Sequence, residues 1–298
     1  MKKLTKKSKV INLGCRLNFF ESEIIENILK KEKDVSKVVI NTCAVTNNAV
    51  QKSIYAVKKA LKDFPNSEVI VTGCASQVEK NRFENLGHIS KIVDNKLKTN
   101  PNSYISEGWV HGQTFNFPSI DYLSTQRTRA MLQIQQGCNH RCTFCIIPYG
   151  RGDAVSLTFT EISKRVKKIL SSGITEIVLT GVDLTSYGED LKGKPKLGSI
   201  LKKLFKLFPN LPRLRLSSID PAEIDRDLLD LFKYERRLMP YLHLSLQSGD
   251  NLILKRMKRR HNREMVLNIC NNLKSFRKDI TFGADLIVGF PTETDENF

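Results

Sequence analysis

Long apolar runs are missing from this sequence of 298 residues. A transmembrane helix needs roughly 20 consecutive apolar residues, and no run here comes near that length. The Lys-rich start, MKKLTKKSKV, is followed by only a short apolar stretch before polar residues resume, so we expect no signal peptide. The expectation is a protein of the cytoplasm without a membrane partner.

Glycine-rich phosphate loops are also missing. Neither the P-loop spacing nor the dinucleotide fingerprint occurs, so ATP and NAD are not expected as cofactors. Acidic residues are in the minority, with 31 Asp and Glu against 48 Lys and Arg, which leaves a formal net charge of +17. This balance indicates either a polyanionic partner such as nucleic acid or simply a basic protein.

Cysteine is present in an odd number, seven, in a chain without a secretory signal. An odd count in this setting argues against a disulfide framework. The thiols should therefore be metal ligands, nucleophiles or buried apolar groups.

The first part of the chain, residues 1–95, alternates short Val- and Ile-rich runs with helical patterns. Strands are predicted at 9–14, 37–42, 68–73 and 90–95, with helices at 21–33 and 47–62. This alternation is typical of an open parallel α/β sheet. Residues 96–129 lose the periodicity and are predicted to connect two domains.

A second alternation fills residues 130–298. Strands are predicted at 130–137, 176–182, 213–218, 241–247 and 283–290, and two of the intervening helices at 160–171 and 198–208. Such a pattern favours a βα barrel. Because the sequence stops where a further helix should begin, we expect a partial barrel, truncated at its C-terminus.

The segment GCNHRCTFC places Cys138, Cys142 and Cys145 on the loop after the first strand of the barrel. Barrel enzymes build their sites at this end of the strands. Structural zinc wants four nitrogen or sulfur ligands, and His140 is poorly placed to be the fourth. Three thiolates would instead leave one iron of a 4Fe-4S cube open for a small molecule. An iron–sulfur cluster is favoured over zinc and over unrelated thiols.

Three further cysteines, Cys15, Cys43 and Cys74, each follow the end of a predicted strand of the first domain. If these strands are parallel, the thiols line one edge of the sheet, where ligands of open α/β sheets bind. A second iron–sulfur site is the favoured interpretation, and three buried apolar cysteines are the alternative. Cys270, inside a helical pattern, is predicted to belong to the core.

Several motifs together carry a family resemblance. They are LGCRLNFFES, NTCAVTNNA, TGCASQ, GCNHRCTFCIIPYGRG, LTGVDLTSYG, RLRLSSIDP, LHLSLQSGDNLILKRMKRRH and ADLIVGFPTET. In order and content they resemble the radical S-adenosylmethionine (SAM) methylthiotransferases. Within that family the pairing of GCRLNFFES with NTCAVTN is most similar to the branch acting on N6-threonylcarbamoyladenosine in tRNA.

The resemblance implies two 4Fe-4S clusters and SAM as cofactors. By position, Cys138, Cys142 and Cys145 match the cluster that cleaves SAM, and Cys15, Cys43 and Cys74 match an auxiliary cluster that handles sulfur. Phe144 and Gly181 are the further positions expected to lie at the cofactor. No residue is assigned an acid–base role.

The reaction implied is replacement of the C2 hydrogen of the modified adenine beside the anticodon with a methylthio group. SAM would serve as methyl donor and as radical source. The implied partners are the tRNA anticodon loop and a low-potential electron donor such as flavodoxin or ferredoxin, with the chain acting as a monomer. The alternatives are another substrate branch of the family, or a noncatalytic tRNA- or metal-binding remnant, since a sixth barrel strand and a C-terminal RNA-binding domain are not found.

The run KRMKRRHNR supplies the cations Lys255, Arg256, Lys258, Arg259, Arg260 and Arg263. A run of this kind can contact several phosphates, and it can equally be a solvated helix face. Arg259 and Arg260 are the two residues that this hypothesis singles out.

Overall fold

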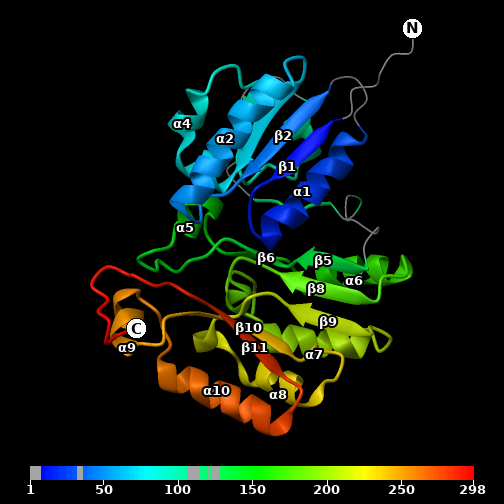
Figure 1. Cartoon of the computed structure of the whole chain (residues 1–298). Coiled ribbons are helices and arrows are strands. Elements are labelled where there is room, and N and C mark those ends of the chain that lie inside the picture. Colours follow the sequence, from blue (N-terminus) through cyan, green and yellow to red (C-terminus); the bar gives the residue numbers. More distant parts are fainter. Residues whose placement is uncertain (1–7, 32–35, 106–114, 120, 122–127) are drawn as a thin grey trace. The chain divides into compact units, whose positions relative to one another are not determined.

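The structure is a computed structural model that describes residues 8–31, 36–105, 115–119, 121 and 128–298. The chain divides into two compact units (Figure 1). Unit 1 is Met1–Ser124 with Ile146–Gly152, and unit 2 is Thr125–Cys145 with Asp153–Phe298. In the part of the chain that is described, no helix combines the length and apolarity needed to cross a bilayer.

Unit 1 contains a parallel sheet in the order β1-β2-β3-β4. The strands are β1 (Lys9–Asn12), β2 (Lys37–Thr42), β3 (Glu68–Gly73) and β4 (Lys91–Ile92). The helices are α1 (Arg16–Leu29), α2 (Asn47–Asp63), α3 (Cys74–Val78), α4 (Lys80–Glu84), η1 (Pro101–Tyr104) and α5 (Ile147–Arg151). The open parallel α/β sheet expected from the sequence is confirmed.

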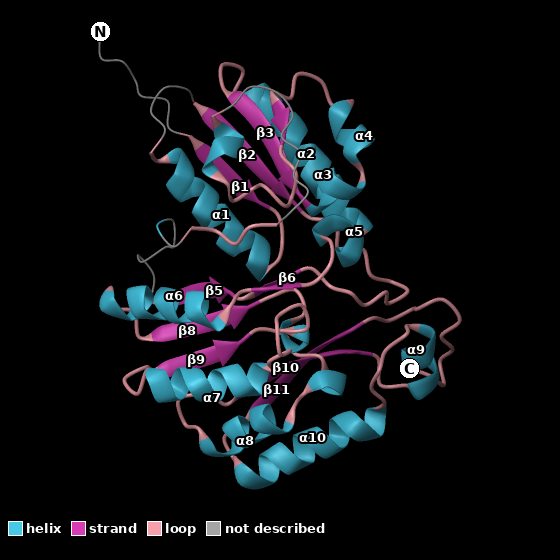
Figure 2. Cartoon of the chain, turned by 180° about the vertical axis from the view of Figure 1, so that it is seen from behind, coloured by secondary structure: helices cyan, strands magenta, loops and turns pink. Residues whose placement is uncertain are grey.

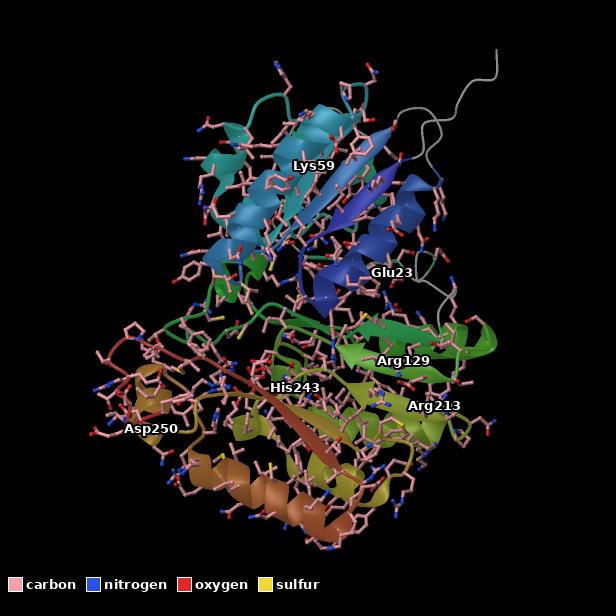
Figure 3. The ribbon with its side chains drawn as sticks, viewed as in Figure 1. Glu23, Lys59, Arg129, Arg213, His243 and Asp250 are labelled. Atoms are coloured by element: carbon pink, nitrogen blue, oxygen red, sulfur yellow. The ribbon has the colours of Figure 1, made fainter. Side chains whose placement is uncertain are left out.

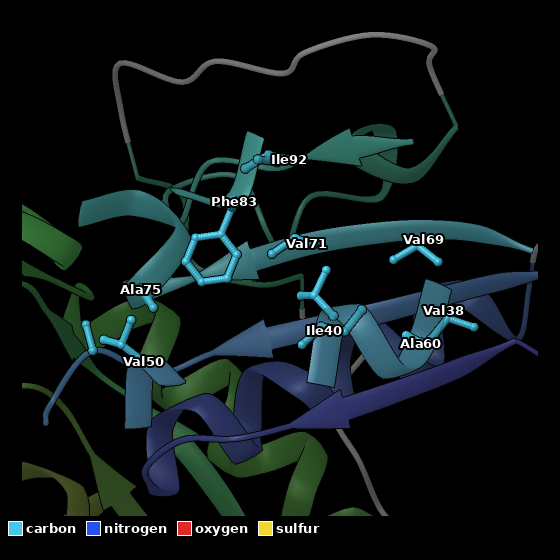
Figure 4. Packing of buried hydrophobic residues seen from close by; sticks show 11 residues of the cluster. Val38, Ile40, Val50, Ala60, Val69, Val71, Ala75, Phe83 and Ile92 are labelled. Atoms are coloured by element: carbon cyan, nitrogen blue, oxygen red, sulfur yellow. The ribbon is translucent and has the colours of Figure 1, made fainter. Parts of the chain in front are cut away.

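The core of unit 1 lies between the sheet and its helices. Figure 4 shows Val38 and Ile40 of β2 and Val71 of β3 with Phe83 beside them, and all four side chains are buried. Each such apolar side chain contributes about 1.5–3 kcal/mol when it leaves water. Helix α1 begins before the predicted start because Leu17 already packs into the core.

Residues after β4, which the sequence places in the connecting segment, also pack with unit 1. The side chain of Lys98 is 1% exposed, and Tyr104 donates a hydrogen bond of 2.5 Å to the carbonyl oxygen of Lys98. Asn100 caps η1 by accepting from the amide of Asn102. This part of the chain is therefore built into unit 1.

Unit 2 is a βα assembly of five parallel strands. They are β5 (Arg129–Gln133), β8 (Glu176–Thr180), β9 (Arg213–Leu216), β10 (Tyr241–Gln247) and β11 (Thr281–Leu286). β5, β8 and β9 form one parallel sheet and β10 pairs with β11. The parallel bridges Leu214↔Leu238 and Ile219↔Leu244 continue the order from the first sheet to the second.

Helices fill the connections of unit 2, as the barrel pattern predicts. They are α6 (Phe159–Ser171), η3 (Leu184–Ser186), α7 (Leu197–Leu207), η4 (Pro221–Glu223), α8 (Arg226–Tyr234), α9 (Asn251–Arg256) and α10 (Arg263–Phe276). Figure 2 shows α6 and α7 alongside the strands. Helix α6 begins after Thr158, whose hydroxyl accepts from the amide of Glu161, and it buries Ile162 and Val166.

The first predicted strand of the barrel is split in two. After β5 the chain leaves β8 and forms β6 (Gln135–Gln136), which pairs antiparallel with β7 (Val155–Ser156). Ile134 still donates to the carbonyl of Thr180, so the change of partner occurs at the next residue. This divergence carries the following loop away from the sheet.

The N-terminal ends of these strands carry an ion cluster. Glu176 at the start of β8 pairs with Arg129, Arg213 and Arg215 at distances of 2.9, 3.1 and 2.7 Å. Figure 3 shows Arg129 and Arg213 at this end of the strands. The candidate site of unit 2 is found at the other end, where the strands finish.

Candidate functional site

The three cysteines of unit 1 lie at the C-terminal edge of its sheet. Thr42 of β2 is the register partner of Gly73 of β3, so the next residues, Cys43 and Cys74, leave neighbouring strands at the same level. Cys15 is the N-cap of α1, which follows β1. Burial raises the pKa of Cys43, and the charges of Cys74 and Cys15 raise this pKa further. The thiols are therefore close enough to interact electrostatically.

Small residues and an amide shape the surroundings of Cys74. Gly73 has φ +103°, and a Cβ placed on it would lie 2.4 Å from the carbonyl oxygen of Thr42. A Cβ on Gly150 would lie 3.3 Å from the Cβ of Cys74. Asn95 donates from Nδ2 to the sulfur of Cys74 at 3.5 Å. Sulfur donors suit iron–sulfur groups, and an amide donor to sulfur is one of the contacts that tune them.

In unit 2, Cys138, Cys142 and Cys145 share the loop that follows β6, and all three are partly buried. The amide of Cys145 donates to the carbonyl of Cys142 at 3.0 Å, which forms a turn within the loop. Thr143 ties the loop to the end of α9, because its hydroxyl donates to the carbonyl of Arg256 at 3.1 Å. All three thiols are therefore carried by one loop that is anchored to the end of α9.

Charged side chains contact two of these thiols. The sulfur of Cys138 lies 3.6 Å from Oδ2 of Asp183, and Nη1 of Arg259 lies 3.6 Å from the sulfur of Cys142. Burial raises the pKa of Cys138 to about 12, and the Asp183 carboxylate adds to the effect.

His140 lies in the same loop but binds carboxylates. Its Nε2 is 3.0 Å from Asp183 Oδ2 and 3.3 Å from Glu223 Oε1. Hydrogen bonds to these two groups raise the pKa of His140 to about 9. Burial alone would raise the pKa of Glu223, yet hydrogen bonds from His140 and Arg260 hold it near 2. His140 is thus a cation at neutral pH.

A single divalent ion could be held by Cys138, His140 and Asp183, whose ligand atoms lie within 4.8 Å of one another. A metal at this position would have to displace the proton of His140, as it would the protons of the thiols. This group and the three thiols of the loop are therefore two alternative donor sets that share Cys138.

Gly181 and Phe144 are the other two candidate positions. A Cβ on Gly181 would lie 2.9 Å from Oε1 of Gln135, and the same oxygen accepts from the amides of Val182 and Asp183 at 2.9 and 2.8 Å. Gly181 thus permits the end of β8 to approach Gln135 closely. Phe144 is 37% exposed, which leaves its ring able to contact a bound molecule.

The basic run divides into buried and exposed cations. Arg259, with 7% of its side chain exposed, donates to Asp220 at 3.0 Å and to the carbonyl of Ser245 at 2.7 Å. Arg260 pairs with Asp220 and Glu223. Arg259 is engaged inside unit 2, so its geometry does not support a phosphate role. Arg260 is exposed, although its guanidinium already pairs with two carboxylates. The other exposed cations of the run are Lys255, Arg256, Lys258 and Arg263.

Sequence reasoning missed the partners that hold these loops. Asp220 and Glu223 were not singled out, although both lie in or beside the RLRLSSIDP motif after β9. Three further residues, Glu21, Lys98 and Arg151, form a buried ion cluster in unit 1. Arg151 lies within a motif that was noted, PYGRG, but no spacing rule links it to Glu21.

Known proteins match this chain over nearly its whole length. The Radical SAM superfamily matches residues 132–298, and the Uncharacterized protein family UPF0004 matches residues 7–94. A Threonylcarbamoyladenosine tRNA methylthiotransferase MtaB from Rickettsia prowazekii (strain Madrid E) is 43% identical over 98% of this chain and 71% of its own length. The chain belongs to the radical SAM methylthiotransferases. The superfamily implies a 4Fe-4S cluster and SAM for this methylthiotransferase.

Two further relatives show the breadth of the likeness. A protein with the same MtaB name from Bacillus subtilis (strain 168) is 33% identical, over 96% of this chain and 67% of its own length. A tRNA-2-methylthio-N(6)-dimethylallyladenosine synthase from Ehrlichia canis (strain Jake) is 34% identical, over 96% of this chain and 70% of its own length.

Among solved structures, the radical S-adenosylmethionine methyltransferase TsrM from Kitasatospora setae has the same fold, with a TM-score of 0.65. The match covers 99% of this chain and 69% of that chain at 12% identity. At this identity the likeness concerns the fold alone.

Proposed function

We propose that this methylthiotransferase acts on tRNA and inserts a methylthio group at C2 of N6-threonylcarbamoyladenosine beside the anticodon. The observation that supports the proposal is that Cys15, Cys43 and Cys74 follow the C-terminal ends of neighbouring parallel strands, in addition to the thiol loop of unit 2. A radical SAM enzyme that only cleaves SAM has no need of a second thiol set. The names of the relatives from Rickettsia prowazekii and Bacillus subtilis support the choice of nucleoside.

Each thiol set has a proposed role. Cys138, Cys142 and Cys145 hold a 4Fe-4S cluster, which when bound supplies the electron that cleaves SAM. Cys15, Cys43 and Cys74 hold a second 4Fe-4S cluster, where sulfur for the product is delivered. The C2 hydrogen of adenine is not acidic, so a radical route suits the replacement of this C–H bond.

The neighbouring side chains would position SAM and the loop. Phe144 would contact the bound SAM, and Gly181 would let the backbone of the β8 end approach it. His140, held as a cation by Asp183 and Glu223, fixes the positions of both carboxylates and lowers the pKa of Glu223. Arg259 fixes the Cys142 end of the loop through its contact with the sulfur.

The substrate is proposed to be bound in part by exposed cations. The net charge of +17 favours a polyanion, and Lys255, Arg256, Lys258 and Arg263 lie on the surface of unit 2. Each phosphate that they neutralise would release counterions. We place the reaction in the cytoplasm, with a low-potential donor such as flavodoxin or ferredoxin and the chain as a monomer.

A second candidate substrate is tRNA carrying N6-dimethylallyladenosine, favoured by the name of the Ehrlichia canis relative. The test offers both tRNAs, each lacking the methylthio group, to anaerobically reconstituted protein with SAM, sulfide and reductant. Mass spectrometry of the digested tRNA should show a methylthio product only from the threonylcarbamoyl substrate. Product from the dimethylallyl substrate alone would move the chain to the other branch.

The noncatalytic alternative is tested by metal analysis of the same preparation. Two 4Fe-4S clusters require about eight irons and eight sulfides per chain. Zinc, or no metal after reconstitution, would favour a tRNA- or metal-binding remnant over the enzyme.

A further inference from the structure

Three ionised side chains are buried together in unit 1. Glu21 lies on α1, Lys98 follows β4, and Arg151 ends α5, and the exposed fraction of each side chain is at most 3%. Arg151 donates from Nη1 to Oε1 of Glu21 at 2.9 Å and from Nη2 to Oε2 at 3.1 Å. Lys98 pairs with the same Oε2. One carboxylate is therefore shared by two cations.

Amide side chains fix this ion cluster beside the cysteines. Asn18, one turn into the helix that begins after Cys15, accepts from Arg151 Nη2 at 2.5 Å and donates to the carbonyl of Thr42 at 2.9 Å. Asn41 accepts from Lys98 Nζ at 3.3 Å. Because Thr42 directly precedes Cys43, the cations are tied to the backbone segments that carry the thiols.

The cations of this cluster lie close to Cys74. Gly150, which directly precedes Arg151, is so near that a Cβ on it would lie 3.3 Å from the Cβ of Cys74. Asn95 donates both to the carbonyl of Gly150 and to the sulfur of Cys74. Deeply buried cations are costly unless negative charge lies near them. Burial lowers the pKa of Lys98, while the charges of Glu21 and Cys74 act to raise it. Positive charge is therefore held beside a thiol of unit 1.

We propose that Arg151 and Lys98 are positioning residues that provide a fixed counter-charge for the iron–sulfur cluster on Cys15, Cys43 and Cys74, and so raise its reduction potential. The inference rests on the proposed function, which puts a cluster there. A 4Fe-4S core with three thiolates is an anion when oxidised, and it gains one more negative charge when one electron is added. Fixed positive charge nearby stabilises the reduced form more than the oxidised form.

The experiment isolates this cluster by starting from a full-length background in which Cys138, Cys142 and Cys145 are replaced by Ala. The protein is reconstituted anaerobically with ferrous iron and sulfide and titrated with titanium(III) citrate. Electron paramagnetic resonance then gives the ratio of reduced to oxidised cluster at each potential. Iron per chain is measured in the same samples.

Three variants in this background separate charge from packing. Arg151→Gln and Lys98→Met each remove one positive charge and are expected to lower the reduced-to-oxidised ratio at a fixed potential about tenfold, equal to about 59 mV for one electron. Arg151→Lys keeps the charge and should stay within about threefold of the background. Lys59→Gln is the matched control, because it removes an exposed cation on α2 (Figure 3) and should change nothing.

Each outcome decides the question. A lowered ratio in Arg151→Gln and Lys98→Met with a normal ratio in Arg151→Lys supports the proposal, and so does loss of iron from the first two with iron retained in Arg151→Lys. An unchanged ratio in Arg151→Gln overturns it, as does an equal loss of iron in Arg151→Lys, which would mean packing alone. If the background itself takes up no iron, the proposed second cluster fails, and this inference fails with it.

Discussion

In unit 1 the three thiols come from three separate segments near an amide and buried cations, whereas in unit 2 they share one loop that contacts both a carboxylate and a guanidinium. Asn95 and the Glu21–Lys98–Arg151 cluster characterise the first site. Asp183 beside Cys138 and Arg259 beside Cys142 characterise the second. If each set holds the proposed cluster, these different surroundings should give the two clusters different potentials.

The largest effect should come from removing either thiol set. Replacing Cys138, Cys142 and Cys145 with Ala should lower 5′-deoxyadenosine formation below about one thousandth of the parent rate, because these thiols are the proposed ligands of the cluster that cleaves SAM. Replacing Cys15, Cys43 and Cys74 should keep most of this formation and about half of the iron, yet leave tRNA unmethylthiolated. Chromatography of the nucleoside and mass spectrometry of the tRNA give the two readouts.

These two triple variants need a parent chain that methylthiolates tRNA, extended at its C-terminus if this length is inactive. Methylthio product from the unit 1 variant would show that those thiols are structural. Loss of 5′-deoxyadenosine from the same variant would show that the two sites do not act separately.

The second prediction compares a crowded glycine of unit 1 with an uncrowded one of unit 2. Gly73→Ala should destabilise unit 1 by about 3 kcal/mol, because a Cβ there meets the backbone of Thr42 and φ is +103°. Gly173→Ala, at φ +84° with no heavy atom within 4 Å of the added Cβ, should cost unit 2 only about 1 kcal/mol from backbone strain. Hydrogen exchange read by mass spectrometry reports each unit by itself. Equal costs would mean that the close approach at Gly73 is relieved by a small backbone shift.

The third prediction uses acid against the carboxylates of unit 2. The pKa of Glu223 is lowered from 4.5 to about 2 in the folded protein, so its stabilising contribution is present above 4.5 and is lost as the pH falls through 2. That contribution is at most about 3 kcal/mol. Glu223→Gln should be less stable at pH 7 and should lose less stability on acidification. Urea unfolding of the metal-free parent and of Glu223→Gln between pH 7 and 2 gives the free energy of unfolding of each as a function of pH. If the two curves fall in parallel, Glu223 is not the group responsible.

The smallest effect concerns the exposed cations of unit 2. Lys255→Ala with Lys258→Ala should reduce the slope of log affinity for tRNA against log salt by about 1.5, because two fewer counterions are released. Lys203→Ala with Lys206→Ala on α7 removes the same charge from an exposed helix face and serves as the control. Fluorescence anisotropy at several salt concentrations measures the slopes. Equal slopes in the two double variants would make these lysines a solvated surface.

The sequence allowed the sheet of unit 1, the strands of unit 2 and the cysteine loop to be predicted because each depends on local periodicity or contiguous spacing. The grouping of Cys15, Cys43 and Cys74 could be foreseen since parallel strands place their ends at one edge. The ion cluster could not, because Glu21 and Arg151 are 130 positions apart and polar contacts at such a separation leave no periodic trace.

The basic run KRMKRRHNR shows what local composition cannot predict. Its composition predicted either a surface for phosphates or a solvated helix face, but composition does not say which arginine turns inward. Arg259 turns inward because Asp220, the N-cap of η4, and the carbonyl of Ser245 on β10 accept its hydrogen bonds. The exposed members of the run are the ones proposed to contact phosphates.

The inclusion of Ile146–Gly152 in unit 1 bears on how the protein is made. This segment follows Cys145 in the sequence, so the ribosome completes the thiol loop of unit 2 before it delivers Arg151 to Glu21. Until then, Glu21 in the newly made N-terminal sheet has Lys98 as a partner but lacks Arg151. Cys74 likewise lacks the close packing of Gly150. A fragment that ends at Ser124 would stay in this condition permanently. If the first three cysteines hold the proposed cluster, its iron should be loaded after synthesis of residue 151, although the last of these cysteines is translated 77 positions earlier.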